Sequence, residues 1–555
     1  MHTPKRKALP AFVVRPTVAV IALAAANAQA VQIDTDDSDL SLRWDNTVKL
    51  SGAYRLKSPD AALLTNPNND DGDRNFAKGL VSSRVDWFTE FDAVYQRRFG
   101  LRLSGAAYYD AAYNTSNDNP GFAGGAFPNQ TSVASNRFPA ATRDLHGRKA
   151  ELLDAFVFAK FDLGELPGSV RAGRHAILWG ESLFLGGNAI SGGQQPVDIV
   201  KLLSVPNTQF KEAIRPVPQV SGQLQLSSTV SLGAYVQTGW EASRVPAVGS
   251  YFSNADPAVD GGENLILGPG APLATRQADF KPKSSGQGGL QLKLRGEGVD
   301  FGLYAIRFHA KTPQLVPQLV MSPAGPMPGG YSMVYHEGIT AFGGSVSKTF
   351  DNFNVAIEAS TRRNQDLAST QGADASAVAP VAKTNNTDNP GYAVGNTAHI
   401  NLSTIGSLGP SLLWKEANLA AELAWNRVLS ITKNAAAKDP NSTRDGLALR
   451  LVLEPVYRGV FDGVDIGVPL GIGYAPKCSR PLAMSSPNAW IPENGGDITV
   501  GLNASVNDAW RATLSFTHYY GKAATFNDLA ANNAYSWQQT YKDRDFIAAS
   551  LRYSF

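Results

Sequence analysis

The 555-residue sequence contains a single cysteine, Cys478, which excludes a disulfide framework and a multi-cysteine zinc site. Charged residues make up only 18% of the chain, below the roughly 25% of an ordinary soluble protein. The 50 basic and 48 acidic residues nearly cancel, so the sequence predicts no nucleic-acid partner. Past the N-terminus there is no apolar run long enough for a transmembrane helix. Hydrophobic residues still supply 43% of the chain, too many for a disordered protein.

The first thirty residues have the organisation of an export signal. Lys5, Arg6 and Lys7 form a basic start, residues 18–26 are apolar, and residues 28–30 read Ala-Gln-Ala. This order is typical of a secretory signal peptide. The apolar run is much shorter than the ~20 residues that a membrane-spanning helix needs, which argues against an N-terminal anchor. The sequence therefore predicts a signal peptide at 1–30 and one mature domain at 31–555.

Strict alternation marks the C-terminus. Phe555, Tyr553 and Leu551 share one face of an extended chain, whereas Ser554 and Arg552 lie on the other. A terminal Phe with apolar residues at every second position before it resembles the last strand of bacterial outer-membrane barrels. An exported chain without a spanning helix is either soluble or a closed β-barrel, because only a closed barrel satisfies the strand backbone in lipid.

The links between the alternating segments decide between these two classes. Short links occur near 96–100, 163–168, 227–229, 296–299, 350–352, 457–463 and 507–509. Long polar links separate them, at 57–82, 111–150, 178–216, 241–287, 309–336, 363–396, 428–444, 475–496 and 520–543. Outer-membrane barrels alternate short periplasmic turns with long extracellular loops in this way. The prediction is an all-β, transmembrane, antiparallel up-and-down barrel in the bacterial outer membrane. It has about 18 strands, with 16 as the alternative, because the hairpin within 397–415 is the least clear.

Aromatic residues lie near the ends of the predicted strands, where interfacial girdles form. They are Tyr54, Trp87, Tyr95, Tyr109, Trp240, Trp425, Trp510 and Tyr519. The opposite, polar face of the strands is predicted to line the lumen. Its principal charged residues are Arg84, Asp86, Glu90, Asp92, Arg171, Arg295, Glu358 and Arg450. A ladder of one sign would indicate ion selectivity, whereas this mixture indicates a general polar wall.

The segment 178–216 is too apolar for a loop in water. Its candidate channel residues are Leu183, Phe184, Leu185, Pro196, Asp198, Ile199, Leu202 and Leu203. Prolines at 196 and 206 bracket a short run that fits a helix. We predict that the segment folds into the lumen as a plug or constriction, which would favour hydrophobic solutes over ions. The alternative is a helix that caps the extracellular rim.

The sequence indicates no catalytic, cofactor or metal site. The acidic stretch 68–75 fails the EF-hand template, since Pro67 occupies the first ligand position and Lys78 replaces the last glutamate. We interpret it as a hydrogen-bonded polar turn, with an isolated Ca²⁺ site as the alternative. No G-x-S-x-G nucleophile motif is present. His175 is the best lone histidine, and a structural role is predicted for it.

Several segments together resemble a known family. They are residues 42–50, 69–79 with 83–86, 173–182, 195–199 with 216–220, and 249–253. Their order and spacing are similar to the proteobacterial outer-membrane family catalogued as domain of unknown function 1302. The resemblance implies an outer-membrane barrel and hydrophobic or lipid-like substrates. It also implies a periplasmic or lipoprotein partner (domain of unknown function 1329) and an inner-membrane transporter of the resistance–nodulation–division class.

The sequence therefore predicts a passive channel, not an enzyme, that carries small hydrophobic or amphipathic solutes and is surrounded by outer-membrane lipids. Two alternatives remain open at this point. The long Asn- and Gly-rich loops would suit an adhesin or receptor, and a hydrolase embedded in a barrel is the other.

Overall fold

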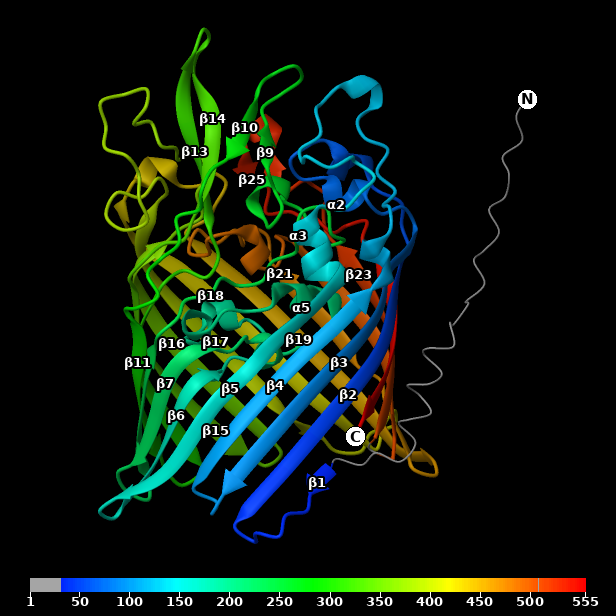
Figure 1. Cartoon of the computed structure of the whole chain (residues 1–555), viewed down its shortest axis with the longest axis vertical. Helices are drawn as coiled ribbons and strands as arrows, with labels where there is room; N and C mark the ends of the chain where they lie inside the picture. The colour runs from blue at the N-terminus through cyan, green and yellow to red at the C-terminus, as the bar shows by residue number, and fades with distance from the viewer. Residues whose placement is uncertain (1–30, 508) are drawn as a thin grey trace, which may run out of the picture.

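The computed structural model describes residues 31–507 and 509–555, and the predicted signal peptide lies outside these ranges. The chain forms a closed antiparallel barrel of 18 strands with a thick layer of loops at one end (Figure 1). The barrel strands are β2 (Leu40–Arg55), β3 (Gly79–Tyr95), β4 (Phe99–Asp110), β5 (Arg148–Leu163), β6 (Leu166–His175), β7 (Val217–Gln225), β8 (Val230–Gln237), β11 (Gln287–Arg295), β12 (Val299–Phe308), β15 (Ile339–Phe350), β16 (Phe353–Asp366), β17 (Val394–Leu408), β18 (Glu416–Lys433), β19 (Asp445–Phe461), β20 (Val464–Gly467) with β21 (Leu470–Ala475), β22 (Gly495–Val506), β23 (Trp510–Tyr520) and β26 (Phe546–Ser554). β20 and β21 form one strand, because both pair with β19 on one side and β22 on the other.

The barrel closes between its first and last long strands. β26 pairs with β2 from Thr47 opposite Ser554 to Arg55 opposite Phe546. The terminal residue completes the ladder, since Asn46 N donates to Phe555 O at 2.7 Å and Phe555 N donates to Asn46 O at 2.9 Å. A closed sheet has no free edge at which another chain could pair.

The predicted alternation of links is confirmed. Short turns join the strands at one end, and the chain crosses the other end in long loops. The uncertain region resolves into β17 and β18, joined by the turn 409–415 and paired from Leu408 opposite Ala417 upward. This hairpin makes the count 18, not 16.

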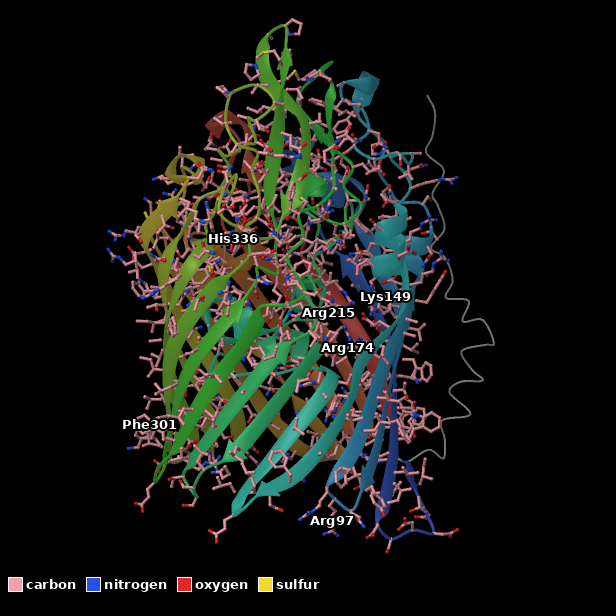
Figure 2. All side chains as sticks on the ribbon, turned by 60° about the vertical axis from the view of Figure 1, so that its left-hand side comes forward. Arg97, Lys149, Arg174, Arg215, Phe301 and His336 are labelled. Atoms are coloured by element: carbon pink, nitrogen blue, oxygen red, sulfur yellow. The ribbon has the colours of Figure 1, made fainter. Side chains whose placement is uncertain are left out.

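The outer face of the barrel is an apolar belt. Among its large exposed side chains are Leu50, Val85, Trp87, Leu103, Val157, Phe301, Leu303, Leu402 and Leu514. Figure 2 shows Phe301 projecting outward near the rim that carries the short turns, where Arg97 also lies. Trp240 and Tyr519 depart from the predicted girdle: Trp240 donates to Ala310 O at 3.2 Å, and Tyr519 is buried among loop residues. No helix in the described ranges is both long and apolar enough to cross a bilayer.

A charge on this belt should be costly. Leu514 is half exposed in the middle of β23. Leu514→Arg is expected to lower the free energy of unfolding of the protein by about 2–4 kcal/mol, because the guanidinium would enter lipid. Urea unfolding of protein folded in lipid vesicles, followed by Trp fluorescence, measures this value. Ser515→Arg, one residue along and facing the lumen, is the matched control. Equal losses in both variants would contradict the assignment of faces.

Outside the barrel wall, the loops have structure of their own. β9 (Asn264–Ile266), β10 (Leu273–Arg276), β13 (Gln314–Ser322) and β14 (Gly325–Val334) make a small sheet above the barrel, visible at the top of Figure 1. β24 (Asn527–Asp528) pairs with β25 (Ala534–Tyr535), and β1 (Val31–Ile33) folds back on β2. The short helical elements of the loops are α2 (Asp71–Arg74), α3 (Ala140–Thr142), η2 (Ala61–Leu64), η3 (Ala111–Asn114), η4 (Ala123–Gly125), η5 (Arg143–Gly147), η7 (Asp256–Ala258), η8 (Ala435–Ala437), η9 (Pro487–Ala489) and η10 (Leu529–Ala531).

The loops are packed into a second core above the barrel. Its buried aromatic residues include Phe76, Tyr113, Phe138, Tyr251 and Phe252. Their rings pack in the edge-to-face and tilted arrangements typical of aromatic clusters. The acidic stretch 68–75 belongs to the same loop layer (Figure 1). It contains the single helical turn α2, in which Asp73 N donates to Asp70 O at 3.0 Å, so the stretch is a hydrogen-bonded polar turn that is mostly buried. The loops between β8 and β11 and between β23 and β26, which are distant in sequence, cover the stretch 68–75.

Candidate functional site: the lumenal insert

The loop between β6 and β7 runs into the barrel. It contains η6 (Gly186–Asn188), α4 (Ser191–Gln194), α5 (Ile199–Ser204) and α6 (Phe210–Ala213). In Figure 1, α5 lies inside the ring of strands, below the loop layer. Residues 176–216 are called the lumenal insert from here on. The backbone N–H and C=O groups of this irregular segment are not paired in a β-ladder. They therefore need hydrogen-bond partners elsewhere, which a regular strand would not need.

The helix that the two prolines suggested begins later than predicted. The Asp198 carboxylate accepts a hydrogen bond from Lys201 N at 3.0 Å and so caps α5 at Ile199. Val197 is still extended and bridges Ile214. Pro196 is therefore a buried residue of the approach to the helix and not its first residue.

One carboxylate on the wall holds the entry of the insert. Glu422 on β18 is almost fully buried, and its Oε2 accepts from three successive backbone N–H groups, those of residues 183, 184 and 185, at 3.2, 2.5 and 2.7 Å. Its Oε1 accepts from Ser182 Oγ and from Asn401 Nδ2, each at 2.7 Å. Successive N–H groups around a carboxylate make a backbone nest, a strong charge-assisted arrangement.

A second carboxylate, Glu358 on β16, binds the next turn. It accepts from Glu181 N at 2.8 Å and from Ile190 N at 2.6 Å. On the same strand, the Arg362 guanidinium donates to the carbonyls of Gly187 and Ala189 at 3.0 and 2.8 Å. The wall thus supplies acceptors for the N–H groups and donors for the carbonyls of one irregular segment.

Asn188 is the polar centre of this docking surface. Its Nδ2 donates to Asn401 Oδ1 at 2.9 Å, and its Oδ1 accepts from Asn426 Nδ2 at 3.0 Å. The His399 ring lies 2.9 Å from the same Oδ1. Buried amides that bind one another in this way favour one conformation, because most alternatives would break several of these hydrogen bonds.

The insert also contacts other parts of the wall. Asn207, after α5, places its Oδ1 2.9 Å from Thr499 Oγ1 on β22 and 3.5 Å from an Arg450 nitrogen on β19. Asp198 pairs with Arg244 of the β8–β11 loop at 2.7 Å, and Arg244 also binds Glu151 on β5. Contacts to β5, β16, β18, β19 and β22 mean that the segment crosses the lumen.

The apolar residues of the insert have two environments. Phe184 is buried, Leu183 and Leu185 are half-buried beside the Glu422 nest, and Leu202 packs with Ile199 on Val197 and Phe210. Leu203 contacts the aromatic core of the loops. Two others remain open to solvent, with Leu178 42% and Val205 41% exposed.

The predicted wall residues divide into paired and free groups. Arg84 binds Asp86 at 2.8 Å, Arg450 binds Asp497 at 2.9 Å, and Asp92 binds Arg102 at 2.7 Å. Glu90 lies 3.4 Å from the same Arg102, and Glu358 is part of the docking surface.

Arg171 stays exposed near the Phe156 ring. Arg295 lies next to the turn 296–298, where it faces Asp300 at 3.8 Å with 78% of its side chain exposed. It therefore belongs to the rim of the barrel.

A second group of charges stands on the β5–β7 side, where Figure 2 shows Lys149, Arg174 and Arg215. Arg174 donates to Glu241 at 3.1 Å, and Arg215 lies 3.4 Å from Glu151. Sequence reasoning missed these pairs because Glu241 lies in the β8–β11 loop and Arg215 in the lumenal insert, where alternation gives no information. His175 is nearby but buried, with its ring nitrogens 2.7 Å from Ser221 Oγ and 3.1 Å from Gly173 O, which is a structural arrangement.

A closed 18-stranded barrel with an apolar belt, a polar interior and long loops at one end is an outer-membrane β-barrel of the bacterial type. Barrels of 16–18 strands are wide enough to leave an aqueous channel. The family model described as "Protein of unknown function (DUF1302)" matches residues 11–555, so the chain belongs to this family.

Three solved structures with similar folds come from Acinetobacter baumannii and Pseudomonas aeruginosa. OccAB1 of Acinetobacter baumannii is 9% identical, with 95% of this chain and 99% of that chain covered and a TM-score of 0.44. The outer-membrane channel DcaP of the same organism is 10% identical over 95% and 100% of the two chains, with a TM-score of 0.36. OpdK of Pseudomonas aeruginosa, crystallised with vanillate, is 9% identical over 93% and 98%, with a TM-score of 0.39. No protein of curated function matches the sequence.

Proposed function

We propose that this protein is a passive outer-membrane channel for hydrophobic or amphipathic, lipid-like compounds, and that the lumenal insert is its constriction. The observation that carries the proposal is the docking of the insert across the lumen on Glu422 and Glu358. A segment held by buried charge-assisted bonds keeps a fixed shape and so can define an aperture.

The surfaces around the insert favour apolar solutes over ions. Several wall charges neutralise one another in pairs, such as Arg450 with Asp497 and Arg84 with Asp86, so they offer little net field to a passing ion. Leu178 and Val205 instead present exposed apolar surface on the insert itself. A solute with an apolar body gains free energy by covering such surface.

We further propose that the barrel works with a periplasmic or lipoprotein partner and an inner-membrane transporter. Such a partner would meet the rim that carries the short turns. The described turns offer exposed apolar side chains there, with Leu413 73% and Phe461 69% exposed. Exposed apolar surface of this kind supports an interaction site at the rim.

The double variant Leu178→Asn/Val205→Asn is expected to pass amphipathic solutes more slowly. Loss of apolar contact worth about 1 kcal/mol at one side chain predicts a roughly fivefold slower flux. The measurement is uptake of a membrane-impermeant amphipathic anion by proteoliposomes, beside uptake of a small sugar. Val381→Asn removes another exposed apolar side chain, 54% exposed, from an extracellular loop and serves as control. Unchanged amphipath flux, or equal slowing of the sugar, would refute an apolar constriction.

A further inference from the structure

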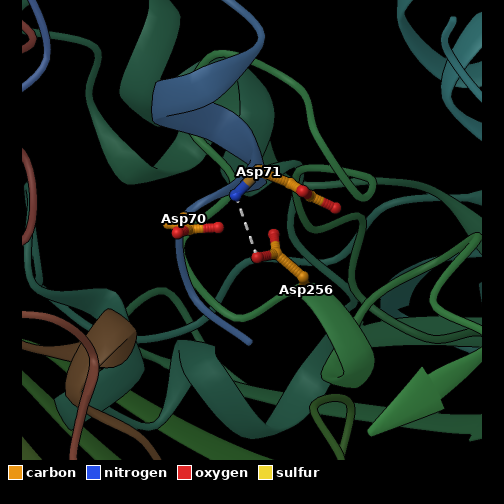
Figure 3. A group of neighbouring side chains, drawn as sticks. All are labelled: Asp70, Asp71 and Asp256. Carbon is orange, nitrogen blue, oxygen red and sulfur yellow. Dashed lines mark hydrogen bonds between the residues drawn. The ribbon is translucent and has the colours of Figure 1, made fainter. Parts of the chain in front are cut away.

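We propose that Asp70, Asp71 and Asp256 form a calcium site that joins the loop after β2 to the loop after β8. The three residues come from two segments 185 residues apart, since Asp70 and Asp71 open α2 and Asp256 opens η7. One carboxylate oxygen of each lies within 4.8 Å of the others. Figure 3 shows the Asp70 and Asp256 carboxylates pointing toward each other, with Asp71 directly beside them.

The second observation concerns the hydrogen bonds of these carboxylates. Asp70 is 0% exposed, and within the described residues its Oδ1 has no hydrogen-bond partner. Its other oxygen is bound by Arg74 Nε at 2.7 Å. Asp256, also fully buried, accepts from Ser253 Oγ at 3.0 Å and from Asp71 N at 3.1 Å. A fully buried carboxylate oxygen without a donor is costly, and a bound cation would remove that cost.

The charges around the cluster are unbalanced. Arg74 pairs with Asp70, and nearby Asp73 is already engaged by Arg55 and Arg544. Burial raises the pKa of Asp70 to about 8 and that of Asp71 to about 6, and burial together with its two acidic neighbours raises the pKa of Asp256 well above its usual range. A bound dication would offset the two excess negative charges and would keep all three carboxylates ionised.

The ligand chemistry selects calcium. All three candidate ligands are carboxylate oxygens, which hard cations prefer over the nitrogen and sulfur ligands of zinc. Ca²⁺ accepts irregular coordination, whereas Mg²⁺ demands an octahedron. Asp71 is only half-buried, so water can complete the shell on its side. Asp256 N also donates to Asn68 O at 2.9 Å, and Asn75 Nδ2 donates to Gly249 O at 2.8 Å, so the ion would bind at an existing junction of the two loops.

The test uses the full-length protein in detergent, titrated with CaCl₂ in a calorimeter. We expect one Ca²⁺ per chain with a Kd of about 10⁻⁴–10⁻³ M, the range of extracellular calcium modules. Asp70→Asn and Asp256→Asn should each weaken binding by at least about tenfold, since each removes a charged ligand. Asp144→Asn, an exposed acid in the β4–β5 loop, should leave it unchanged. The absence of Ca²⁺ binding, undiminished binding in Asp70→Asn, or equal affinity for MgCl₂ would overturn the proposal.

A second measurement covers the case in which a variant folds poorly. Carboxyls with raised pKa bind protons more tightly in the folded state, so their contribution to stability is complete below the unfolded pKa and is lost as pH rises through the folded pKa. In EGTA, the melting temperature of the native chain should therefore fall as pH rises from about 4, the ordinary carboxyl range, towards about 8, and should then level off. Saturating Ca²⁺ should abolish this fall, and Asp70→Asn should lessen it without Ca²⁺. A melting temperature that depends on pH equally with and without Ca²⁺ would contradict the site.

Discussion

Replacing residues 183–205 by a flexible Gly/Ser linker of about eight residues is expected to raise single-channel conductance by about an order of magnitude, because an 18-stranded barrel without an internal segment leaves an open aqueous channel. The exchange removes the Glu422 nest, η6, α4 and α5 together. The barrel ladder should survive, since β6 and β7 pair directly with each other from Gly168 opposite Leu224 to His175 opposite Val217.

Planar-bilayer recording measures the conductance, and heat-modifiable migration on a gel reports whether the barrel is folded. A milder variant separates docking from bulk. Glu422→Gln keeps the shape but removes the charge from bonds that are worth about 1.5–3 kcal/mol when charged. It should therefore increase the fraction of time in high-conductance states without changing their size.

Glu454→Gln is the control for this variant. It neutralises another lumen-facing glutamate, on β19, whose Oε1 accepts from Asn503 Nδ2 at 2.9 Å, away from the insert. A folded barrel in which the linker variant conducts no better than the native protein would show that the insert does not limit the pore. An equal effect of Glu454→Gln and Glu422→Gln would show that wall charge, and not docking, controls conductance.

Asp73→Ala is expected to destabilise the extracellular layer by about 3–5 kcal/mol, the cost of removing one partner from a buried ion pair. The Asp73 carboxylate lies 3.1 Å from Arg55 Nη2 and 2.9 Å from Arg544 Nη2, and both guanidinium groups are fully buried. Asp543 would remain as a partner of Arg55 at 2.9 Å, but Arg544 would lose its carboxylate contacts. The chain termini of the barrel meet here, since Arg55 ends β2 and Arg544 immediately precedes β26.

Thermal unfolding and limited proteolysis of the loops measure this effect. We expect earlier cleavage within the loops of Asp73→Ala and a lower melting temperature. Asp162→Ala is the matched control, because it removes the carboxylate of an ion pair of similar length, 3.1 Å to Arg98, that is more than half exposed. Exposed pairs contribute about 0–1 kcal/mol. Similar losses in the two variants would mean that burial does not determine the cost.

The sequence predicted the barrel well because its dominant signal is local. A period of two, as in the final strand, depends only on which face of one strand meets lipid, and loop lengths follow from the same segmentation. The turn 409–415 was the least clear, because Leu412 and Leu413 continue the apolar character of β17 into an exposed turn.

The candidate sites were only partly predictable. The apolar residues of the insert stood out from the polar loops, but their docking partners did not. Glu422 lies on the polar face of a strand like many other charged residues, and only the folded backbone of residues 183–185 distinguishes it. Likewise, Asp256 has no local signature, since its relation to Asp70 depends on how two loops pack above the barrel.

The pairing of β26 with β2 has a consequence for biogenesis. The partners Thr47 and Ser554 are separated by more than 500 residues, so the two strands that close the barrel lie far apart in the sequence. Until β26 is in place, the edge of β2 that faces it is unpaired and could associate with other chains. Closure of the barrel is therefore a late, non-local step of folding, and before it the partly folded chain is prone to aggregate.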